Sequence, residues 1–297
     1  MSLDLNGTFA TVAANGLEFE VLTAGEGDRL ALCLHGFPEH AISWRLQIPT
    51  LVELGYRVWA PNLRGYGRTT RPADVAAYDI AHLLDDVAAL IDVSGARSVT
   101  LIGHDWGAAI AWLFAIRRIR DLERLVIMNV PHPALFTKAL KTSWRQRGRS
   151  WYMGAFQIPK LPEYLLTRDR AAIVGRMFRT AVSDAPGLAP DIVDYYRERA
   201  CEPGAMTAML AWYRAAARGG MAEQLKRGVP VIDVPTLMIW GEDDIALGKE
   251  TTYGTERYVS NLRLNYVPGA SHWVNQDAPE RVNELLHGFL GEALAIP

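Results

Sequence analysis

The sequence is poor in cysteine and has no long apolar run. With two cysteines in 297 residues, Cys33 and Cys201, no disulfide framework is expected, and both are predicted to be reduced and structural. No stretch of about 18 apolar residues is present, which excludes a transmembrane helix. The N-terminal segment has no basic region followed by an apolar one, so a signal peptide is not expected. These absences predict a cytoplasmic protein.

The usual motifs for metals and nucleotides are also missing. There is no HExxH or CxxC spacing, no P-loop and no GxGxxG fingerprint, so neither a metal nor an organic cofactor is expected. A formal net charge of -2 gives no reason to expect nucleic acid as a partner. Any chemistry is therefore predicted to come from the side chains of the chain itself.

What the sequence does contain is an alternation of short apolar runs and amphipathic helical patterns, such as 80–92 and 107–117. Two alternating segments at the start, Phe9–Ala14 and Leu17–Ala24, predict an antiparallel hairpin that turns at Asn15-Gly16. Six later runs are typical of buried parallel strands: Leu30–Leu34, Val58–Pro61, Val99–Ile102, Leu125–Met128, Thr236–Trp240 and Leu264–Val267. The pattern predicts an α/β protein with a mainly parallel eight-stranded sheet flanked by helices.

The alternation stops near residue 131 and resumes near residue 229. The sequence between these points is helical, rich in Trp and Tyr, and lacks another clear buried strand. We predict a core domain built from residues 1–130 and 230–297. Residues 131–229 are predicted to form an inserted helical lid, or cap, over the carboxyl ends of the strands, where open α/β sheets place their sites.

A basic and apolar stretch opens the predicted lid, and no acidic residue occurs between Glu123 and Glu163. Such a pattern can contact an anionic surface. We expect instead a solvated helix that pairs with acidic side chains of the core, and keep the anionic surface as the alternative. The stretch comprises Lys138, Lys141, Arg145, Arg147 and Arg149, interleaved with Leu135, Phe136, Leu140 and Trp144.

The motif with the most functional information is Gly103-His104-Asp105-Trp106-Gly107, between a predicted strand and a predicted helix. Strand, tight turn and helix with flanking glycines are the signature of a nucleophile elbow, which presents one reactive side chain. Here that side chain is Asp105 rather than serine. A carboxylate can displace at an sp3 carbon to form an alkyl ester. The sequence therefore indicates a hydrolase that acts on epoxides or alkyl halides.

Two loops lie where an elbow aspartate needs partners. His35-Gly36-Phe37-Pro38 directly follows a predicted strand, so the Phe37 N–H, together with the Trp106 N–H, can form an oxyanion hole. His272 follows the last predicted strand and is suited to deprotonate water. Among the acids that follow Trp240, we predict that Asp244 orients His272, with Asp243 as the weaker candidate.

The predicted lid contributes one further candidate. The segment 203–219 is expected to be a helix that carries Met206, Met209, Leu210 and Tyr213 on one face. The Tyr213 hydroxyl can donate a proton to an epoxide oxygen as the ring opens, although core packing would give the same pattern. From the residues alone, both readings stay open.

Taken together, these motifs resemble those of the epoxide hydrolases of the α/β-hydrolase fold, over nearly the whole chain. The matching runs are His35-Gly36-Phe37-Pro38-Glu39, Ser43-Trp44-Arg45, Gln47-Ile48-Pro49, Arg64-Gly65-Tyr66-Gly67, Gly103-His104-Asp105-Trp106-Gly107, Trp212-Tyr213-Arg214 and Gly269-Ala270-Ser271-His272-Trp273. The resemblance implies that Asp105 is the nucleophile, His272 the base and Asp244 its partner.

The resemblance also implies two lid tyrosines that polarise the epoxide. Tyr213 matches one of them. In the family the other commonly precedes a Phe-Gln pair, whereas here Ala155 precedes Phe156-Gln157. Tyr152 lies three residues earlier, one turn away in a helix, and is the candidate to replace it.

The predicted function is hydrolysis of an epoxide to a vicinal diol through an aspartyl ester, with a small apolar epoxide and water as partners. A dehalogenase with the same nucleophile is the alternative, although Phe37 stands where haloalkane dehalogenases often place an Asn. A non-catalytic ligand-binding protein is the rival from another class. The chain is predicted to be a monomer or homodimer. The apolar pocket is predicted from Phe37, Trp44, Trp106, Met153, Leu247 and Trp273.

Overall fold

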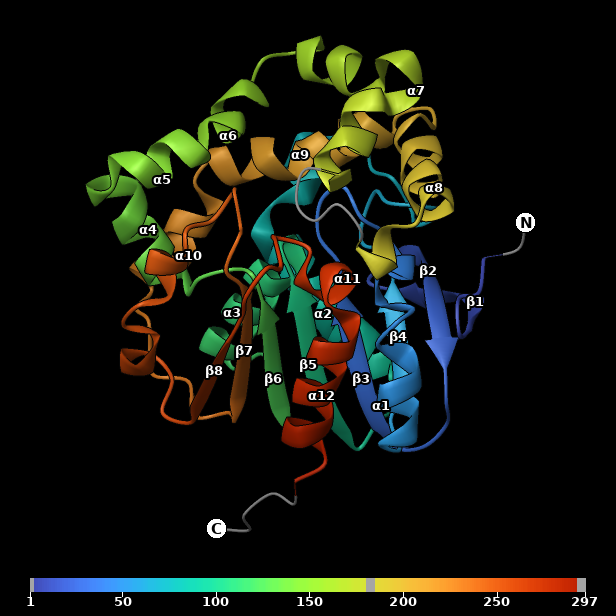
Figure 1. The fold of residues 1–297 in the computed structure, drawn as a ribbon, viewed down its shortest axis with the longest axis vertical. Coiled ribbons are helices and arrows are strands. Elements are labelled where there is room, and N and C mark those ends of the chain that lie inside the picture. The colour runs from blue at the N-terminus through green and yellow to red at the C-terminus, as the bar shows by residue number, and fades with distance from the viewer. Residues whose placement is uncertain (1–2, 180–184, 293–297) are drawn as a thin grey trace.

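The computed structural model describes residues 3–179 and 185–292 and contains an eight-stranded sheet (Figure 1). The spatial order is β1-β2-β4-β3-β5-β6-β7-β8, and every pairing from β4 to β8 is parallel. The predicted mainly parallel α/β sheet is confirmed. The strands are β1 (Thr8–Ala14), β2 (Leu17–Ala24), β3 (Arg29–Leu34), β4 (Arg57–Pro61), β5 (Ser98–His104), β6 (Arg124–Met128), β7 (Thr236–Gly241) and β8 (Leu262–Val267).

The antiparallel part of the sheet is the predicted hairpin. β1 pairs with β2 from Thr8↔Thr23 to Ala14↔Leu17, and β2 then pairs antiparallel with β4. Asn15 and Gly16 both have positive φ, 47° and 71°, as a two-residue turn between twisted strands requires. The turn residues therefore fix the register of this edge.

Helices cover both faces of the sheet (Figure 1). Successive residues of β3 point to opposite faces: Leu30, Leu32 and Leu34 belong to one apolar cluster, and Ala31 and Cys33 to the other. A strand that is buried on both faces has no polar alternation, which explains its continuous apolar run. The helices that flank the sheet are α1 (Ile48–Glu53), α2 (Ile80–Ser94), α3 (Trp106–Arg117), α11 (Val274–Asp277) and α12 (Pro279–Leu290).

In the described residues, a mainly helical segment, called here the insertion, lies between β6 and β7. Its helices are α4 (Pro133–Thr142), α5 (Trp144–Arg149), α6 (Trp151–Ala155), α7 (Leu161–Arg179), α8 (Pro190–Ala200), α9 (Ala205–Ala217) and α10 (Gly220–Lys226). The backbone of α7 leaves the helical region at 168–171, where the helix bends. Short 3-10 turns complete the chain at Ala41–Trp44, Val75–Tyr78, Pro186–Leu188, Lys249–Thr252 and Thr255–Arg257.

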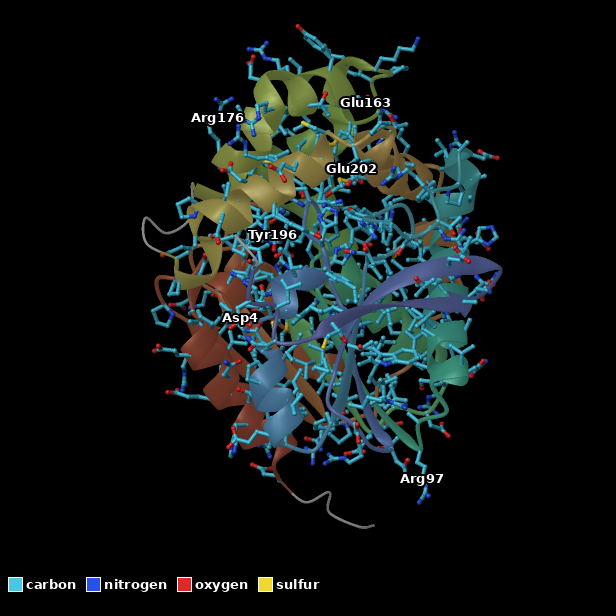
Figure 2. All side chains as sticks on the ribbon, turned by 90° about the vertical axis from the view of Figure 1, so that its right-hand side faces the viewer. Asp4, Arg97, Glu163, Arg176, Tyr196 and Glu202 are labelled. Carbon is cyan, nitrogen blue, oxygen red and sulfur yellow. The ribbon has the colours of Figure 1, made fainter. Side chains whose placement is uncertain are left out.

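The insertion lies over the carboxyl ends of the parallel strands. Figure 2 shows Glu163 and Arg176 of the insertion at one end of the molecule and Arg97 at the other. Arg97 directly precedes β5, so the amino ends of the parallel strands face away from the insertion. Tyr196 of α8 ties the two parts together, because its hydroxyl donates to Gln276 of α11 at 3.2 Å. Within the described ranges, no helix combines the length and apolar composition needed to cross a bilayer.

Candidate active site

The turn between β5 and α3 holds Asp105 in a strained backbone conformation. Its φ of 48° and ψ of -120° are rare for a residue with a side chain. A Cβ atom on Gly103 would lie 2.5 Å from the Gly107 carbonyl oxygen, and one on Gly107 would overlap the Leu34 carbonyl. The two glycines therefore allow the strand and the helix to approach closely enough for this turn, as expected of an elbow.

The Asp105 carboxylate is held between two loops. Its Oδ1 accepts a hydrogen bond from the Phe37 N–H at 2.8 Å, and its Oδ2 lies 3.3 Å from Nε2 of His272. A Cβ on Gly36 would overlap the Asp105 side chain, so this loop position requires glycine. Of the two expected backbone donors, Phe37 makes the bond. Within the described part of the chain, no hydrogen bond joins the Trp106 N–H to Asp105.

His272 is oriented by Asp244 from the loop after β7. Nδ1 of His272 lies 2.7 Å from Oδ2 of Asp244, whose side chain is fully buried. The other oxygen, Oδ1, accepts from the N–H groups of Ala246 at 2.7 Å and Leu247 at 2.8 Å. Because every contact around Asp244 is with a donor, the carboxylate stays fixed and keeps the second imidazole nitrogen directed at Asp105.

The arrangement of Asp105, His272 and Asp244 determines the direction in which the pKa values of His272 and Asp105 shift. Burial alone would lower the pKa of His272, but Asp244 and Asp105 on either side of the ring raise it well above its usual value. Burial would likewise raise the pKa of Asp105, yet the hydrogen bond and the charge of His272 lower it. Each partner of this pair therefore favours the charged form of the other.

Asn129 supports the same chain of hydrogen bonds, which the sequence did not predict. It follows β6, and its Nδ2 donates to Oδ2 of Asp244 at 2.8 Å, while its Oδ1 accepts from the Gly241 N–H at 2.9 Å. The signal in the sequence was its place at the end of a core strand. An amide there adds a donor to Asp244, whereas a second carboxylate would repel it.

Two buried histidines hold the loops that carry these groups. His104 contacts Oε2 of Glu39 at 2.7 Å through Nδ1 and the His272 carbonyl at 2.7 Å through Nε2. His35 accepts from the Leu63 N–H at 3.1 Å through Nε2. Burial lowers the pKa of His35 to about 4, although the hydrogen bond to the Gly36 carbonyl opposes this shift, so the ring is neutral near pH 7. Through these contacts both rings brace the loops around Asp105.

Opposite Asp105, the insertion supplies two phenols. Tyr213 of α9 is buried, and its ring packs edge-on against Phe37 at 5.4 Å, Trp106 at 5.1 Å and Phe156 at 5.0 Å. The Tyr152 ring of α6 lies 6.0 Å from the Tyr213 ring. Burial, followed by the charge of Asp105, raises the pKa of both hydroxyls. Both phenols are therefore protonated and close enough to Asp105 to sense its charge.

Asp105 and both phenols line one cavity of about 790 Å³ between the core and the insertion. Of the predicted pocket residues, Trp106, Met153 and Leu247 line it. The sequence did not predict the wall formed by α4 and α10. Its apolar members include Phe136, Leu140, Met221 and Leu225. In the sequence, Phe136 and Leu140 are notable only as part of the basic stretch, and no motif singles out Met221 or Leu225.

Three predicted pocket residues do not line this cavity, so for them the prediction was wrong. Phe37 has its ring covered by Phe156 and Tyr213, and it reaches the site through its backbone instead. Trp273 packs against Phe178, with ring centroids 5.0 Å apart, on another side of His272. Trp44 is fully buried in the apolar cluster on the α12 face of the sheet.

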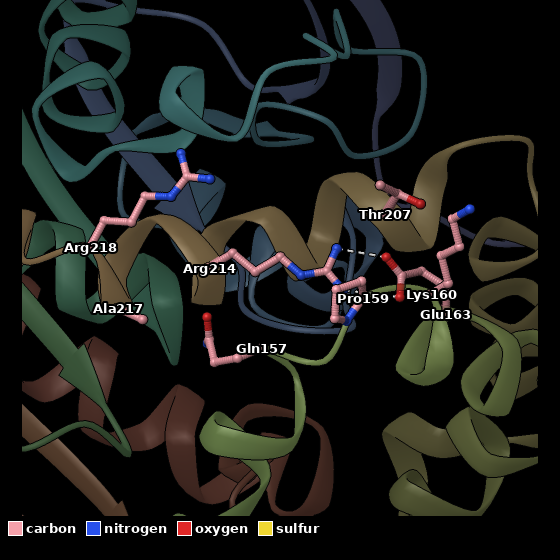
Figure 3. Close-up of a pocket in the computed structure, with 8 residues that line it drawn as sticks. All are labelled: Gln157, Pro159, Lys160, Glu163, Thr207, Arg214, Ala217 and Arg218. Atoms are coloured by element: carbon pink, nitrogen blue, oxygen red, sulfur yellow. Dashed lines mark hydrogen bonds and ion pairs between the residues drawn. The ribbon is translucent and has the colours of Figure 1, made fainter.

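A second hollow, of about 680 Å³, lies on the outer side of α9, and charged side chains are among those that line it (Figure 3). Arg214 crosses it to pair with Glu163 at 2.6 Å. Gln157 and Ala217 line both this hollow and the main cavity, but none of the groups around Asp105 does. Among described residues, no three His, Cys, Asp or Glu side chains are grouped as metal ligands would be.

Comparison with known proteins places this arrangement in a family. The model of the alpha/beta hydrolase family matches residues 31–285. The AB hydrolase superfamily protein YfhM of Bacillus subtilis (strain 168) is 38% identical over 94% of this chain and 96% of its own. Epoxide hydrolase 4 of Mus musculus is 35% identical over 96% of this chain and 79% of its own.

Solved structures agree with the sequence relatives. The epoxide hydrolase of Bacillus megaterium in complex with an inhibitor superposes with a TM-score of 0.86 at 31% identity, over 95% of this chain and all of that one. Epoxide hydrolase A from Mycobacterium thermoresistibile gives a TM-score of 0.83 at 31% identity, over 96% of this chain and 98% of that one. The chain belongs to the alpha/beta hydrolase family, within the branch that holds these epoxide hydrolases.

Proposed function

We propose that this protein hydrolyses an epoxide to a vicinal diol through a covalent ester on Asp105. The observation that carries the proposal is the placement of two protonated phenols, Tyr213 and Tyr152, in the same cavity as a carboxylate that His272 contacts at 3.3 Å. A nucleophile on one side and proton donors on the other are what ring opening needs. The relatives named epoxide hydrolases support the same activity.

In the first step, Oδ2 of Asp105, the oxygen that the Phe37 N–H does not bind, attacks an epoxide carbon and the C–O bond of the ring breaks. The oxygen that leaves becomes an alkoxide, which takes a proton from Tyr213 or Tyr152. The Phe37 N–H holds the other carboxylate oxygen at 2.8 Å and so directs the attacking one toward the cavity. The product of this step is a hydroxyalkyl ester.

Ester formation changes the protonation of His272. The ester carries no charge, so one of the two carboxylates that raise the pKa of His272 is lost and the pKa falls. The imidazolium then returns its proton to the phenolate and becomes neutral. In this neutral form His272 can take a proton from water, and it is therefore the base that the second step requires.

In the second step, the hydroxide attacks the carbonyl carbon of the ester while the Phe37 N–H, and in this proposal that of Trp106, stabilise the oxyanion. Collapse releases the diol and restores the Asp105 carboxylate beside the imidazolium. Atoms and protons balance: one epoxide and one water give one diol. Asp244 does not react, but its buried charge keeps His272 oriented.

The proposal treats residues 131–229 as a cap domain over a core of 1–130 and 230–297, with the substrate between them. The mostly apolar wall of the cavity favours a small apolar epoxide. No cofactor has a part in the reaction. The two phenols favour epoxides over alkyl halides, because an alkoxide needs a proton when it leaves and a halide does not.

An oxygen-labelling experiment tests the ester route. Wild-type enzyme in excess over styrene oxide, in water enriched in oxygen-18, should place the label in the Asp105 carboxylate and not in the first diol released. Peptide mass spectrometry locates the label, and an Asp105→Ala variant serves as the unlabelled control. Label in the diol after a single turnover would mean that water attacks the epoxide directly, and the proposal would fail.

A further inference from the structure

The insertion exposes two tryptophans that the proposed chemistry does not use. Trp144 in α5 is 79% exposed and Trp151 in α6 is 71% exposed, the highest values among the large apolar side chains of the described residues. Single exposed apolar residues are common on proteins. Here two exposed indoles lie on adjacent short helices, close in sequence to residues that line the cavity. This arrangement requires an explanation.

The two indoles lie on one face of a nearly continuous helical path. The Ser150 N–H donates to the Gln146 carbonyl at 2.9 Å, so the helical bonding continues from α5 into α6. Trp144, Arg147, Gly148 and Trp151 follow i, i+3, i+4 and i+7 spacing, and all four are exposed. The opposite side is buried, since the Gln146 side chain donates to Ser150 at 3.0 Å and to the Ala246 carbonyl at 2.9 Å. We call the exposed side the α5–α6 face.

The surroundings of this face are positively charged. Lys138 and Lys141 of α4 and Arg145 and Arg147 of α5 are exposed, and none forms an ion pair within the described residues. The expected pairing of this stretch with acidic side chains of the core is therefore not found. Only the neighbouring Arg149 turns inward, toward Gly248 and Glu250. No acidic residue lies in 124–162 to neutralise the four free cations.

The face also borders the cavity that holds Asp105. Leu140 and Lys141 of α4 and Met153 and Gly154 of α6 line that cavity, and Lys141 and Gly154 are exposed as well. The cavity therefore extends to the surface beside the α5–α6 face. Figure 1 shows α4, α5 and α6 following one another along one outer edge of the insertion, with α10 next to α4.

We propose that the α5–α6 face binds the surface of an anionic lipid bilayer, with the two indoles in the headgroup region. Unpaired basic side chains complement acidic headgroups, and tryptophan is the side chain that favours the boundary between water and acyl chains. A second copy of the chain fits less well, because a symmetric contact would place these like charges opposite one another. The attachment is peripheral.

This binding gives the proposed activity a source of substrate. An apolar epoxide partitions into a bilayer, and a cavity whose opening borders the bound face can take it up from there. That consequence rests on the proposed function, whereas the binding itself does not. Vesicle binding and epoxide turnover can therefore fail independently.

Sedimentation with vesicles tests the binding. The full chain is mixed with vesicles of phosphatidylcholine, with or without phosphatidylglycerol, and the bound fraction is measured at low and high salt. Wild-type protein should bind only the anionic vesicles, and salt should weaken the binding. Two double variants, Trp144→Ala with Trp151→Ala and Lys138→Glu with Arg145→Glu, should each bind about tenfold more weakly or worse.

Two control variants change exposed residues outside the α5–α6 face. Tyr164→Ala removes an aromatic ring that is 63% exposed in α7, and Arg97→Glu reverses a charge at the far end of the molecule (Figure 2). Both should bind like wild type. Four results would overturn the proposal: no binding to anionic vesicles, equal binding by the double variants, binding to duplex DNA but not to vesicles, or a dimer that the tryptophan substitutions abolish.

Discussion

The core and the insertion contribute different chemistry to the candidate site. The core supplies the charged groups, and each is fixed by hydrogen bonds at the end of a strand: Asp105 by Phe37, His272 by Asp244, and Asp244 by Asn129. The insertion supplies neutral phenols, whose rings pack against aromatic neighbours, and Tyr213 also has a side-chain hydrogen bond with Trp106. Buried charges require compensating charges, whereas a buried neutral phenol requires packing for its ring and a hydrogen-bond partner for its hydroxyl.

This difference explains why the phenols can change place along the chain. Tyr152 stands one helical turn before Ala155, the position that precedes Phe156-Gln157. Because α6 carries the ring on its inner side, the phenol still lies within 6.0 Å of the Tyr213 ring, centroid to centroid. A shift of this kind in Asp244 would break four hydrogen bonds at once.

The largest effect is expected from breaking the charged chain of the core. Asp244→Asn should lower turnover of styrene oxide by roughly 1,000- to 10,000-fold, because an amide cannot hold the imidazolium in the required orientation. Steady-state rates of diol formation measure this loss. Asp243→Asn, at an exposed neighbour, is the control and should stay near wild type. Equal losses in both variants would contradict the role of Asp244 in orienting His272.

A smaller effect is expected from the phenols of the insertion. Tyr213→Phe and Tyr152→Phe should each lower kcat by roughly 100-fold or more, since each removes a positioned proton donor. The exposed Tyr164→Phe is the matched control and should leave kcat unchanged. If Tyr152→Phe turns over as fast as wild type, Tyr213 acts alone.

A further variant sharpens this comparison of packing with hydrogen bonding. Combining Tyr152→Phe with Ala155→Tyr moves the phenol to the position that precedes Phe156. If packing alone positions the phenol, kcat should recover by about tenfold relative to Tyr152→Phe. The double variant must unfold at the same temperature as wild type. If its kcat still does not recover, the backbone of α6 decides at which position a tyrosine can donate the proton.

Protonation of the buried His35 should destabilise the folded chain in acid. The pKa of His35 is lowered by burial from 6.5 to about 4, so the unfolded chain takes up a proton that the folded chain excludes. Stability is fully present above pH 6.5 and is lost as the pH falls toward 4, by about 3 kcal/mol for this group. Urea unfolding across this range should show a shallower pH dependence for His35→Gln. An unchanged dependence would contradict the assignment.

The smallest effect concerns the walls of the cavity. Met153→Ala should lower kcat/KM for styrene oxide by roughly fivefold, corresponding to about 1 kcal/mol of lost apolar contact. Trp273→Phe, outside the cavity, should leave KM unchanged and lower only the free energy of unfolding. A raised KM for Trp273→Phe would mean that Trp273 does contact the substrate.

The sequence predicted the core well because its signals are local. Glycines around Asp105, turn residues at Asn15-Gly16 and continuous apolar runs each act over a few residues. β5 extends to His104 and β8 begins at Leu262, two residues beyond the predicted ends in each case. Such differences fall where hydrogen bonds to a neighbouring strand, rather than side-chain pattern, decide the boundary.

What the sequence did not predict depends on contacts between distant segments. Asn129 reaches Asp244 across 115 positions, because β6 and β7 pair side by side after the insertion. The wall from α4 and α10 likewise depends on how the insertion folds back over α3. Apolar periodicity identifies a buried side of a helix, but an empty cavity and a packed neighbour produce the same pattern.

The ester on Asp105 is the central claim, and one measurement tests it most directly. His272→Gln lacks the base of the second step, so this variant should accumulate the ester when incubated with styrene oxide and 1-bromohexane together. Intact mass spectrometry should show an increment equal to the whole epoxide, located at Asp105 and absent from an Asp105→Ala partner variant. A hexyl increment would assign the site to alkyl halides, and diol formation without any adduct would contradict the covalent route.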